Sequence, residues 1–303
     1  MLNLLPTAYF SKCLNKNNTG LGNVLYQIST IYSICKKYNI PFNAYYMNKY
    51  LEKLQEFGLN HNETIFRNID LSIQEEKTDI TLVSKDGNIY SEKLIEDILK
   101  NKDKNILIKS SYLQSIKYFI QYEKEIKDLF KPNRQFKRIV GKKYPKIFDS
   151  TQSNICIQMR LNWEGRGGIK LNYKFILKAI EYLKNNNFIQ NNINLWIFSD
   201  NIPEAKNILS CISNYNIIFV NENKYDYEDL WMMSLINNHI VSFSTFSWWG
   251  AFLNKNENKK VIYSYDFCNK LSKRKNGKYS PETFQQNIYP DNWICLKEKY
   301  ILQ

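Results

Sequence analysis

Two short stretches of this chain carry side chains that could hold a phosphate group. RLNWEGR contains Arg160 and Arg166, two of only six arginines in a chain whose positive charge lies mostly on lysine. The planar guanidinium of arginine matches a pair of phosphate oxygens in a way that a lysine ammonium does not. SFSTFSWWGAF begins at Ser242 and places hydroxyl groups directly before a helix-like run. Both stretches therefore indicate binding of an anion.

The SFSTFSWW stretch offers the start of a helix as an anion site. HIVSFS is typical of a strand and SWWGAFLN of a helix, and the first backbone N–H groups of a helix lack partners within it. A capped helix of the protein core is the alternative interpretation. We expect Trp248 and Trp249 to pack and fix the turn, because they lie inside the helix. The candidate anion-binding residues of the turn are consecutive: Ser244, Thr245, Phe246 and Ser247.

These stretches lie in a second half in which strands and helices alternate. The predicted strands cover residues 154–160, 193–200, 216–223, 239–244 and 259–266, and the predicted helices cover 172–186, 203–212, 226–238 and 247–254. Such alternation is typical of an α/β protein with a parallel sheet covered by helices. Ligands of such sheets bind outside the carboxyl ends of the strands. The polar residues expected at that edge are Arg160, Ser199, Asp200, Asn221, Glu222 and Asp266, together with 242–247.

The first half opens with a glycine turn before an apolar helical run. Gly20, Gly22 and Asn23 of this GLGN turn are candidates for a close approach of the backbone to a ligand. The turn lacks the GxGxxG pattern and the lysine of a P-loop, so a plain turn before a helix is the alternative. The elements predicted in this half are helices at 24–38 and 121–130, the second ended by KPNRQF, and strands at 40–46 and 105–114.

Length and composition exclude several classes of protein. The chain has 303 residues, of which 44% are apolar and 15% aromatic, enough for one large folded domain or two. The net charge of +13 favours an anionic partner, although scattered lysine is also typical of a solvated surface. His61 and His239 lie far apart and the six cysteines form no CxxC pair, so a histidine or zinc-ribbon metal site is not expected.

The sequence also bears on location. No apolar run reaches the roughly 18 residues that span a bilayer, and the N-terminus does not resemble a signal peptide. We therefore expect a soluble, cytoplasmic protein, with peripheral membrane contact left open. Base-stacking aromatic residues interleaved with basic ones are not evident, so nucleic acid is not an expected partner.

Four blocks, in order, resemble the α-1,2-fucosyltransferase family, glycosyltransferase family 11. GLGNVLYQ resembles its GGLGNqmFQ signature, IFSDN its iFSDD segment, and DLWMMSLINNHIVSFSTFSWWGAFLN its SSFSWW block with the preceding helix. YPDNWICL resembles its closing segment. The blocks cover nearly the whole chain, with the middle of the first half unmatched. The SFSWW block is the specific one, and the glycine and SD blocks add weight only through their order.

The resemblance implies a GT-B-like fold, with two facing Rossmann-like domains and mostly parallel sheets. We predict an acceptor-side domain at 1–149 and a donor domain with a C-terminal tail at 150–303. It implies inverting transfer of fucose, or a related deoxyhexose, from a nucleotide sugar such as GDP-fucose to a galactose-type hydroxyl of a glycan or glycoconjugate. It implies no bound metal and no cofactor apart from the donor as co-substrate.

One departure from the family bears on the chemistry. The family's H-x-R-R-G-D segment reads QMRLNW here, so that only Arg160 is kept while the histidine place holds Gln158. We assign Arg160 to the donor diphosphate and Glu164, the nearest carboxylate, to the general base, with Asp200 as the second choice. A UDP- or dTDP-linked donor is an alternative to GDP-fucose. A non-catalytic protein that binds glycans or polyanions on the same fold is the alternative to an enzyme.

Overall fold

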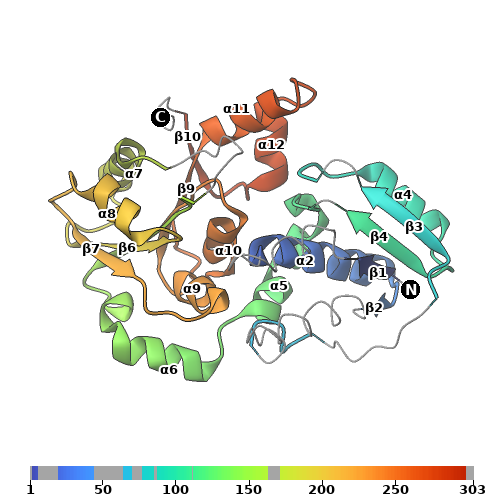
Figure 1. Ribbon diagram of the computed structural model, residues 1–303, viewed down its shortest axis with the longest axis horizontal. Helices are drawn as coiled ribbons and strands as arrows, with labels where there is room; N and C mark the ends of the chain where they lie inside the picture. Colours follow the sequence, from blue (N-terminus) through green and yellow to red (C-terminus); the bar gives the residue numbers. More distant parts are fainter. Residues whose placement is uncertain are drawn as a thin grey trace. The chain divides into compact units, whose positions relative to one another are not determined.

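The computed structural model describes residues 2–5, 20–43, 64–69, 77–84, 87–110, 112–162 and 171–297 (Figure 1). The chain divides into two compact units, Met1–Lys131 with Thr283–Pro290, and Pro132–Glu282 with Asp291–Gln303. Each unit contains one sheet, and every described pair of neighbouring strands is parallel. The predicted α/β class with parallel sheets is therefore confirmed.

The units divide earlier in the chain than the predicted boundary after residue 149. Helix α6 (Arg134–Lys143) belongs to the second unit, because its Phe136 ring packs edge-on against Trp231 at 5.2 Å. The following turn is joined to the same unit, since Asn154 Nδ2 donates to the Lys146 carbonyl at 2.8 Å. Thr283–Pro290 belongs to the first unit, where Asn287 Oδ1 accepts from Tyr90 N at 2.8 Å.

The second unit is built on six parallel strands in the order β10-β9-β8-β5-β6-β7. Read from β7, this is the 3-2-1-4-5-6 order of the Rossmann fold. The chain leaves β5 outwards through β6 to β7, then returns to place β8 on the other side of β5, so the topological switch point lies between β5 and β8. The strands are β5 (Ser153–Met159), β6 (Ile193–Ser199), β7 (Asn216–Val220), β8 (Asn238–Ile240), β9 (Val261–Ser264) and β10 (Ile294–Leu296).

Helices cover both faces of this sheet. Alternate residues of the central strands, such as Ile155 and Ile157, pack in one cluster with Phe175, while Cys156 between them faces the opposite side. Both sets are buried, which explains why apolar residues follow one another from Ile155 to Ile157 instead of alternating with polar ones. The helices between the strands are α7 (Tyr173–Asn185), α8 (Ile202–Leu209), α9 (Asp226–Met233), α10 (Thr245–Leu253) and α11 (Tyr265–Arg274).

The first unit has a smaller parallel sheet in the order β2-β1-β4-β3. Its strands are β1 (Leu2–Leu5), β2 (Phe42–Asn43), β3 (Ile80–Ser84) and β4 (Ile106–Ser110), and its helices include α2 (Leu21–Tyr38), α4 (Glu92–Lys100) and α5 (Glu123–Phe130). Helix α12 (Pro281–Ile288) begins in the second unit and contributes most of its length to the first. The predicted helices of this half are present, with α2 beginning at Leu21.

Two helical glycines give a matched test of packing in the second unit. A Cβ on Gly250 of α10 would lie 2.9 Å from Met233 Cβ of α9, so Gly250→Ala is expected to destabilise by about 1–2 kcal/mol despite its better helix propensity. A Cβ on Gly141 of α6 would meet nothing closer than 3.7 Å, so Gly141→Ala should stabilise by about 0.5–1 kcal/mol. Denaturant midpoints measure both changes. Equal signs for the two variants would contradict the close packing of α9 on α10.

Candidate functional site

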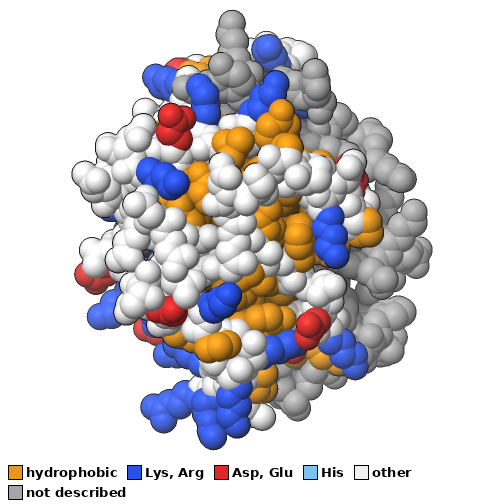
Figure 2. Space-filling model, turned by 90° about the vertical axis from the view of Figure 1, so that its left-hand side faces the viewer, with side chains coloured by type: hydrophobic (Ala, Val, Ile, Leu, Met, Phe, Trp, Pro, Cys, Tyr) orange, Lys and Arg blue, Asp and Glu red, His pale blue; other side chains and the backbone are white. Residues whose placement is uncertain are grey.

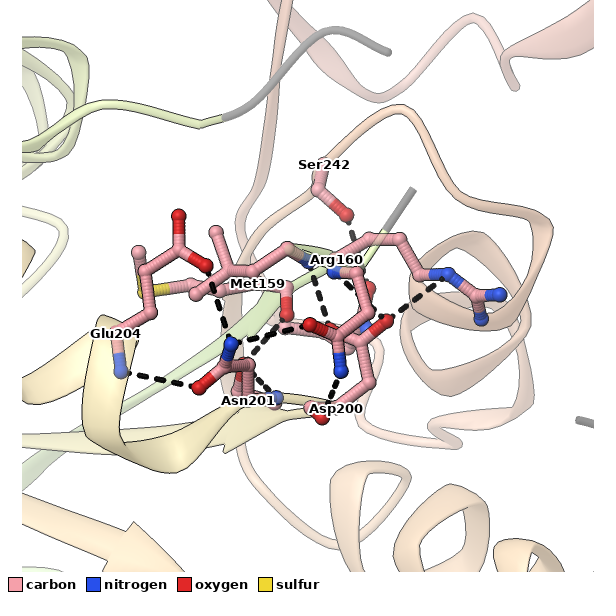
Figure 3. A network of polar contacts seen from close by, with 10 residues as sticks. Met159, Arg160, Asp200, Asn201, Glu204 and Ser242 are labelled. Atoms are coloured by element: carbon pink, nitrogen blue, oxygen red, sulfur yellow. Dashed lines mark hydrogen bonds and ion pairs between the residues drawn. The ribbon is translucent and has the colours of Figure 1, made fainter. Parts of the chain in front are cut away.

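Arg160 stands directly after β5, where the Asp200 carboxylate fixes its direction (Figure 3). Arg160 Nε lies 3.2 Å from Asp200 Oδ2, and Asp200 follows the neighbouring strand β6. The same carboxylate accepts from the backbone N–H groups of Leu161, at 2.7 Å to Oδ1, and Asn162, at 3.3 Å to Oδ2. One carboxylate therefore holds both the guanidinium and the backbone that follows it.

Amide and hydroxyl groups connect the same two strand ends a second time. Asn162 Nδ2 donates to the Asp200 carbonyl at 2.7 Å, and Asn201 Nδ2 donates to Asn162 Oδ1 at 3.0 Å. Ser199 Oγ donates to the Met159 carbonyl at 2.8 Å. Asn201 also caps α8, because its Oδ1 accepts from Glu204 N at 3.1 Å. The residues after β5 are thus tied to a helix start, which favours a fixed Arg160.

The arrangement leaves Arg160 suited to an anionic ligand. Its side chain is 29% exposed, and Figure 3 shows the terminal nitrogens of the guanidinium on the side away from the Asp200 carboxylate. An arginine oriented by a carboxylate in this way loses less conformational entropy when it binds phosphate oxygens. Since both Asp200 oxygens accept hydrogen bonds, a positioning role fits this carboxylate better than proton acceptance.

The start of α10 forms the other side of the switch point. Ser244 is the N-cap in an extended conformation, and its side chain makes no capping hydrogen bond to α10. Phe243, Ser244, Thr245 and Phe246 are partly exposed, whereas Ser242 and Ser247 are buried. The predicted strand-to-helix turn is therefore confirmed. Its first backbone N–H groups have no cap from the Ser244 side chain, as an anion-binding helix start requires.

Buried hydrogen bonds join this turn to β5. Ser247 Oγ accepts from Ser242 N at 3.2 Å, and Ser242 Oγ donates to Gln158 Oε1 at 3.0 Å. Gln158 lies two residues before Arg160, so the chain of contacts crosses the switch point from β5 to the residues after β8. The Ser247 hydroxyl shapes the turn rather than pointing to solvent. Sequence reasoning missed this role of Gln158, although a polar residue inside an apolar strand was a usable signal.

The two tryptophans of α10 pack inside the unit, as predicted. Trp248 is 2% exposed and stacks on Phe252 with ring centroids 4.6 Å apart. It also lies 5.5 Å from Trp293, which precedes β10. Trp249 is fully buried beside Phe252. These contacts hold α10 rigidly, so the position of its first turn is set by the core.

Several candidate residues lie elsewhere. Asn221 and Glu222 follow β7, which β6 separates from β5; both are exposed, and Glu222 pairs with Lys143 at 2.6 Å. Asp266 lies in the first turn of α11, two residues after β9, which β8 separates from β5. Glu164 lies outside the described residues. The structure thus brings Arg160, Ser199 and Asp200 together beside the α10 turn, and the β7 pair is not part of that group.

The glycine turn belongs to the first unit and begins α2. Gly20 has φ 60° and ψ 30°, a left-handed conformation that glycine adopts without strain. Asn23 N donates to the Gly20 carbonyl at 2.8 Å, and Asn23 Oδ1 accepts from Gln114 Nε2 at 2.8 Å. Gly22 is buried inside the helix. These contacts explain the turn as the start of a helix, and its ligand role stays a prediction.

A buried histidine makes stability of the second unit depend on pH. Burial, with the nearby Lys259 cation, lowers the pKa of His239 in β8 to about 3. The unfolded chain therefore takes up a proton below about pH 6.5 that the folded protein refuses, and stability is lost as the pH falls. As the pH is lowered from about 6 to 4, the free energy of unfolding of His239→Gln should rise relative to that of wild type by about 1.4 kcal/mol per pH unit. Urea titrations at several pH values measure this difference.

Asp229 supplies a comparison of opposite sign. Burial raises the pKa of this α9 carboxyl to about 7, with Asp226 and Glu228 adding to the shift. The folded protein therefore keeps a proton that the unfolded chain releases above about pH 4, so this group loses stability as the pH rises towards 7. Asp229→Asn should accordingly change the pH dependence in the direction opposite to His239→Gln. The same slope for both variants would contradict the burial of one of them.

The described residues show neither a metal cluster nor a membrane-spanning helix. They contain no group of three histidine, cysteine or carboxylate side chains placed to hold a metal ion. In the same part of the chain, none of the helices combines the length and the apolar character needed to cross a bilayer. The predicted independence from metal stays a prediction.

Sequence comparisons connect the chain with named glycosyltransferases over part of its length. No family model matches it. It is 36% identical over 85 residues to the O-antigen biosynthesis glycosyltransferase WbnK of Escherichia coli. This match covers 28% of this chain and 27% of the relative. The chain is 26% identical over 155 residues to an alpha-1,2-colitosyltransferase of Escherichia coli, covering 47% of this chain and 49% of the relative. Each match thus spans half or less of the relative.

A solved structure also aligns with half of the chain. The crystal structure of NodZ alpha-1,6-fucosyltransferase soaked with GDP-fucose gives a TM-score of 0.32 at 12% identity, covering 49% of this chain and 51% of that chain. That likeness is too low to bear on function. The resemblance predicted from the motif blocks is confirmed by the sequence relatives: over part of its length the chain is similar to proteins named as glycosyltransferases, one of them an α-1,2-transferase.

Proposed function

We propose that this protein is a glycosyltransferase that moves fucose, or a related deoxyhexose, from a nucleotide-diphosphate donor to a glycan hydroxyl. The observation that carries the proposal is the pairing at one switch point of Arg160, held by Asp200, with the uncapped start of α10. Both features bind phosphate oxygens, and a nucleotide diphosphate places such oxygens next to the reacting sugar. The glycosyltransferase names of both sequence relatives support this choice.

The proposed reaction inverts the anomeric carbon and needs no metal. An acceptor hydroxyl attacks that carbon from the face opposite the diphosphate, and the bond to the diphosphate breaks with its electron pair staying on oxygen. Arg160 and the α10 start stabilise the charge that builds on the leaving group, which is the role of a metal in other transferases. The acceptor proton passes to a general base, for which Glu164 remains our proposal from the sequence.

The proposed donor is GDP-fucose, and the proposed acceptor is a galactose-type hydroxyl. One relative is named for the transfer of colitose with an α-1,2 linkage, so a related sugar on the same type of nucleotide is the nearest variant. A UDP- or dTDP-linked donor is the next alternative. The proposed arrangement is GT-B-like, with the second unit holding the donor and the first holding the acceptor.

A thermal-shift panel tests the donor class directly. GDP, UDP, dTDP and CMP, with their common sugars, are added to the purified protein with and without EDTA. A ligand at 100 times its dissociation constant stabilises the folded state by about 2.7 kcal/mol. Stabilisation by GDP species that EDTA leaves unchanged is the expected result, followed by transfer to a galactoside. Stabilisation by another nucleotide changes the donor. No stabilisation by any nucleotide, with binding to glycans, means a non-catalytic binding protein.

A further inference from the structure

Helix α6 and the turn after it form a strongly basic, exposed segment of the second unit. Residues 134–146 contain six lysines and arginines and no aspartate or glutamate. All six are exposed: Arg134, Lys137, Arg138, Lys142, Lys143 and Lys146. Lys143 pairs with Glu222 after β7, so one of the charges is compensated from another element. The segment nevertheless concentrates much of the net charge of +13 in a few turns.

Two large apolar side chains lie exposed on the same segment. Ile139 is 53% exposed and Phe148 is 52% exposed. Phe136 and Val140 are buried one turn apart and attach the helix to the unit, which directs Arg134 and Arg138 outwards. The Phe148 ring lies near Gly141, since a Cβ there would be 3.7 Å from it. Exposed apolar side chains therefore lie among the cations both on α6 and in the turn that follows it.

A second exposed helix of the same protein has a different distribution of charge. Residues 92–104, which include α4, carry four lysines and four carboxylates. Lys93 and Asp97, four residues apart on α4, also form an ion pair there at 3.3 Å. Such a balanced surface is typical of a solvated helix. The segment with α6 has no comparable balance, which favours an anionic partner.

We infer that α6 and Phe148 dock on the surface of an anionic lipid membrane. A basic helix with an exposed aliphatic and an exposed aromatic side chain has the composition of interfacial helices, in which cations meet lipid headgroups and apolar groups enter the acyl boundary. Figure 2 shows lysine and arginine side chains gathered at the lower end of one face, the end where α6 lies in Figure 1, beside hydrophobic side chains. Nucleic acid fits less well, because only one of the two exposed apolar side chains, Phe148, offers a ring for base stacking.

Vesicle sedimentation of the full-length protein tests the inference independently of any transfer activity. We expect binding to vesicles that contain phosphatidylglycerol, none to vesicles of phosphatidylcholine alone, and release by salt. Each basic residue at such a surface contributes about 1 kcal/mol, or about fivefold, so Arg138→Gln with Lys142→Gln should weaken binding about 30-fold. The matched control removes two exposed lysines from the balanced segment 92–104, Lys100→Gln with Lys102→Gln, and should leave binding unchanged.

A separate variant tests the contribution of apolar side chains to vesicle binding. Ile139→Ser should also weaken binding several-fold at constant net charge, and its exposed position means that the thermal midpoint should stay near that of wild type. Equal losses in the α6 variant and the α4 control would mean non-specific attraction and overturn the inference. Absence of vesicle binding would overturn it too, as would salt-sensitive binding of a polyuridylate that the α6 variant abolishes while vesicles remain unbound.

Discussion

Replacing Arg160 with alanine is expected to lower kcat for sugar transfer by at least about a hundredfold. That is the usual cost of removing one donor that stabilises developing charge in a transition state. Arg160 is held at Nε by Asp200, and it follows β5, which pairs with β8, the strand before α10. Loss of the side chain removes the charge and the fork together. Initial rates at saturating donor and acceptor measure the effect.

Two other variants serve as comparisons for Arg160→Ala. Arg160→Lys keeps the positive charge without the planar fork, so its kcat should fall between those of wild type and the alanine variant. Lys100→Ala removes an equal charge from the exposed end of α4 and should leave transfer unchanged. Donor binding should weaken in the thermal-shift assay for Arg160→Ala alone. Near-normal turnover of that variant would exclude Arg160 from the reaction.

The regular half of the fold was predictable because of how its strands are buried. β5 and β6 are covered on both faces and read as short strands with mainly apolar centres, and the helices between strands carry amphipathic patterns of ordinary length. Strand order was not predictable from periodicity. It depends on which strands pair, and β8 pairs with β5 although more than seventy residues separate them along the chain.

The helices that were not predicted have no clear signal in the sequence that sets them apart from the neighbouring strand or loop. Helix α11 begins directly after β9, with Ser264 as both the last strand residue and the N-cap, so the predicted strand continued into the helix. Helix α6 follows KPN, where Asn133 Oδ1 accepts from Phe136 N at 2.7 Å. It buries only Phe136 and Val140, and a helix with so narrow an apolar face resembles a polar loop in sequence.

The sequence predicted that the candidate site lies at the carboxyl ends of the strands, but it did not predict which strand ends lie together. Each polar residue was expected at the carboxyl edge, and this expectation brought Arg160 and Asp200 together correctly. It also included Asn221 and Glu222, because sequence does not tell which strand lies at the edge of the sheet. The contact of Gln158 with Ser242 joins residues 84 positions apart, and it becomes visible only when the strands are paired.

Asp200→Ala is expected to lower kcat by up to about a hundredfold through the position of Arg160. The carboxylate holds Arg160 Nε at 3.2 Å and the Leu161 N–H at 2.7 Å, so its loss frees both the guanidinium and the backbone beside it. A displacement of about 1 Å at a catalytic group can cost about a hundredfold in rate. Asp200→Asn keeps an oxygen for the Leu161 N–H but loses the charge, so it should retain more activity than the alanine variant.

The pH dependence of kcat separates a positioning role of Asp200 from that of a general base. A base leaves an acidic limb in the profile that disappears with it, whereas a positioning residue lowers the rate evenly across pH. Glu204→Gln is the matched control, because this nearby carboxylate accepts a hydrogen bond from Asn201 Nδ2 at 3.2 Å. Its kcat should change by less than about threefold. Loss of the acidic limb in Asp200→Asn would make Asp200 the base. Wild-type kcat in Asp200→Ala would mean that Arg160 is held in place without it.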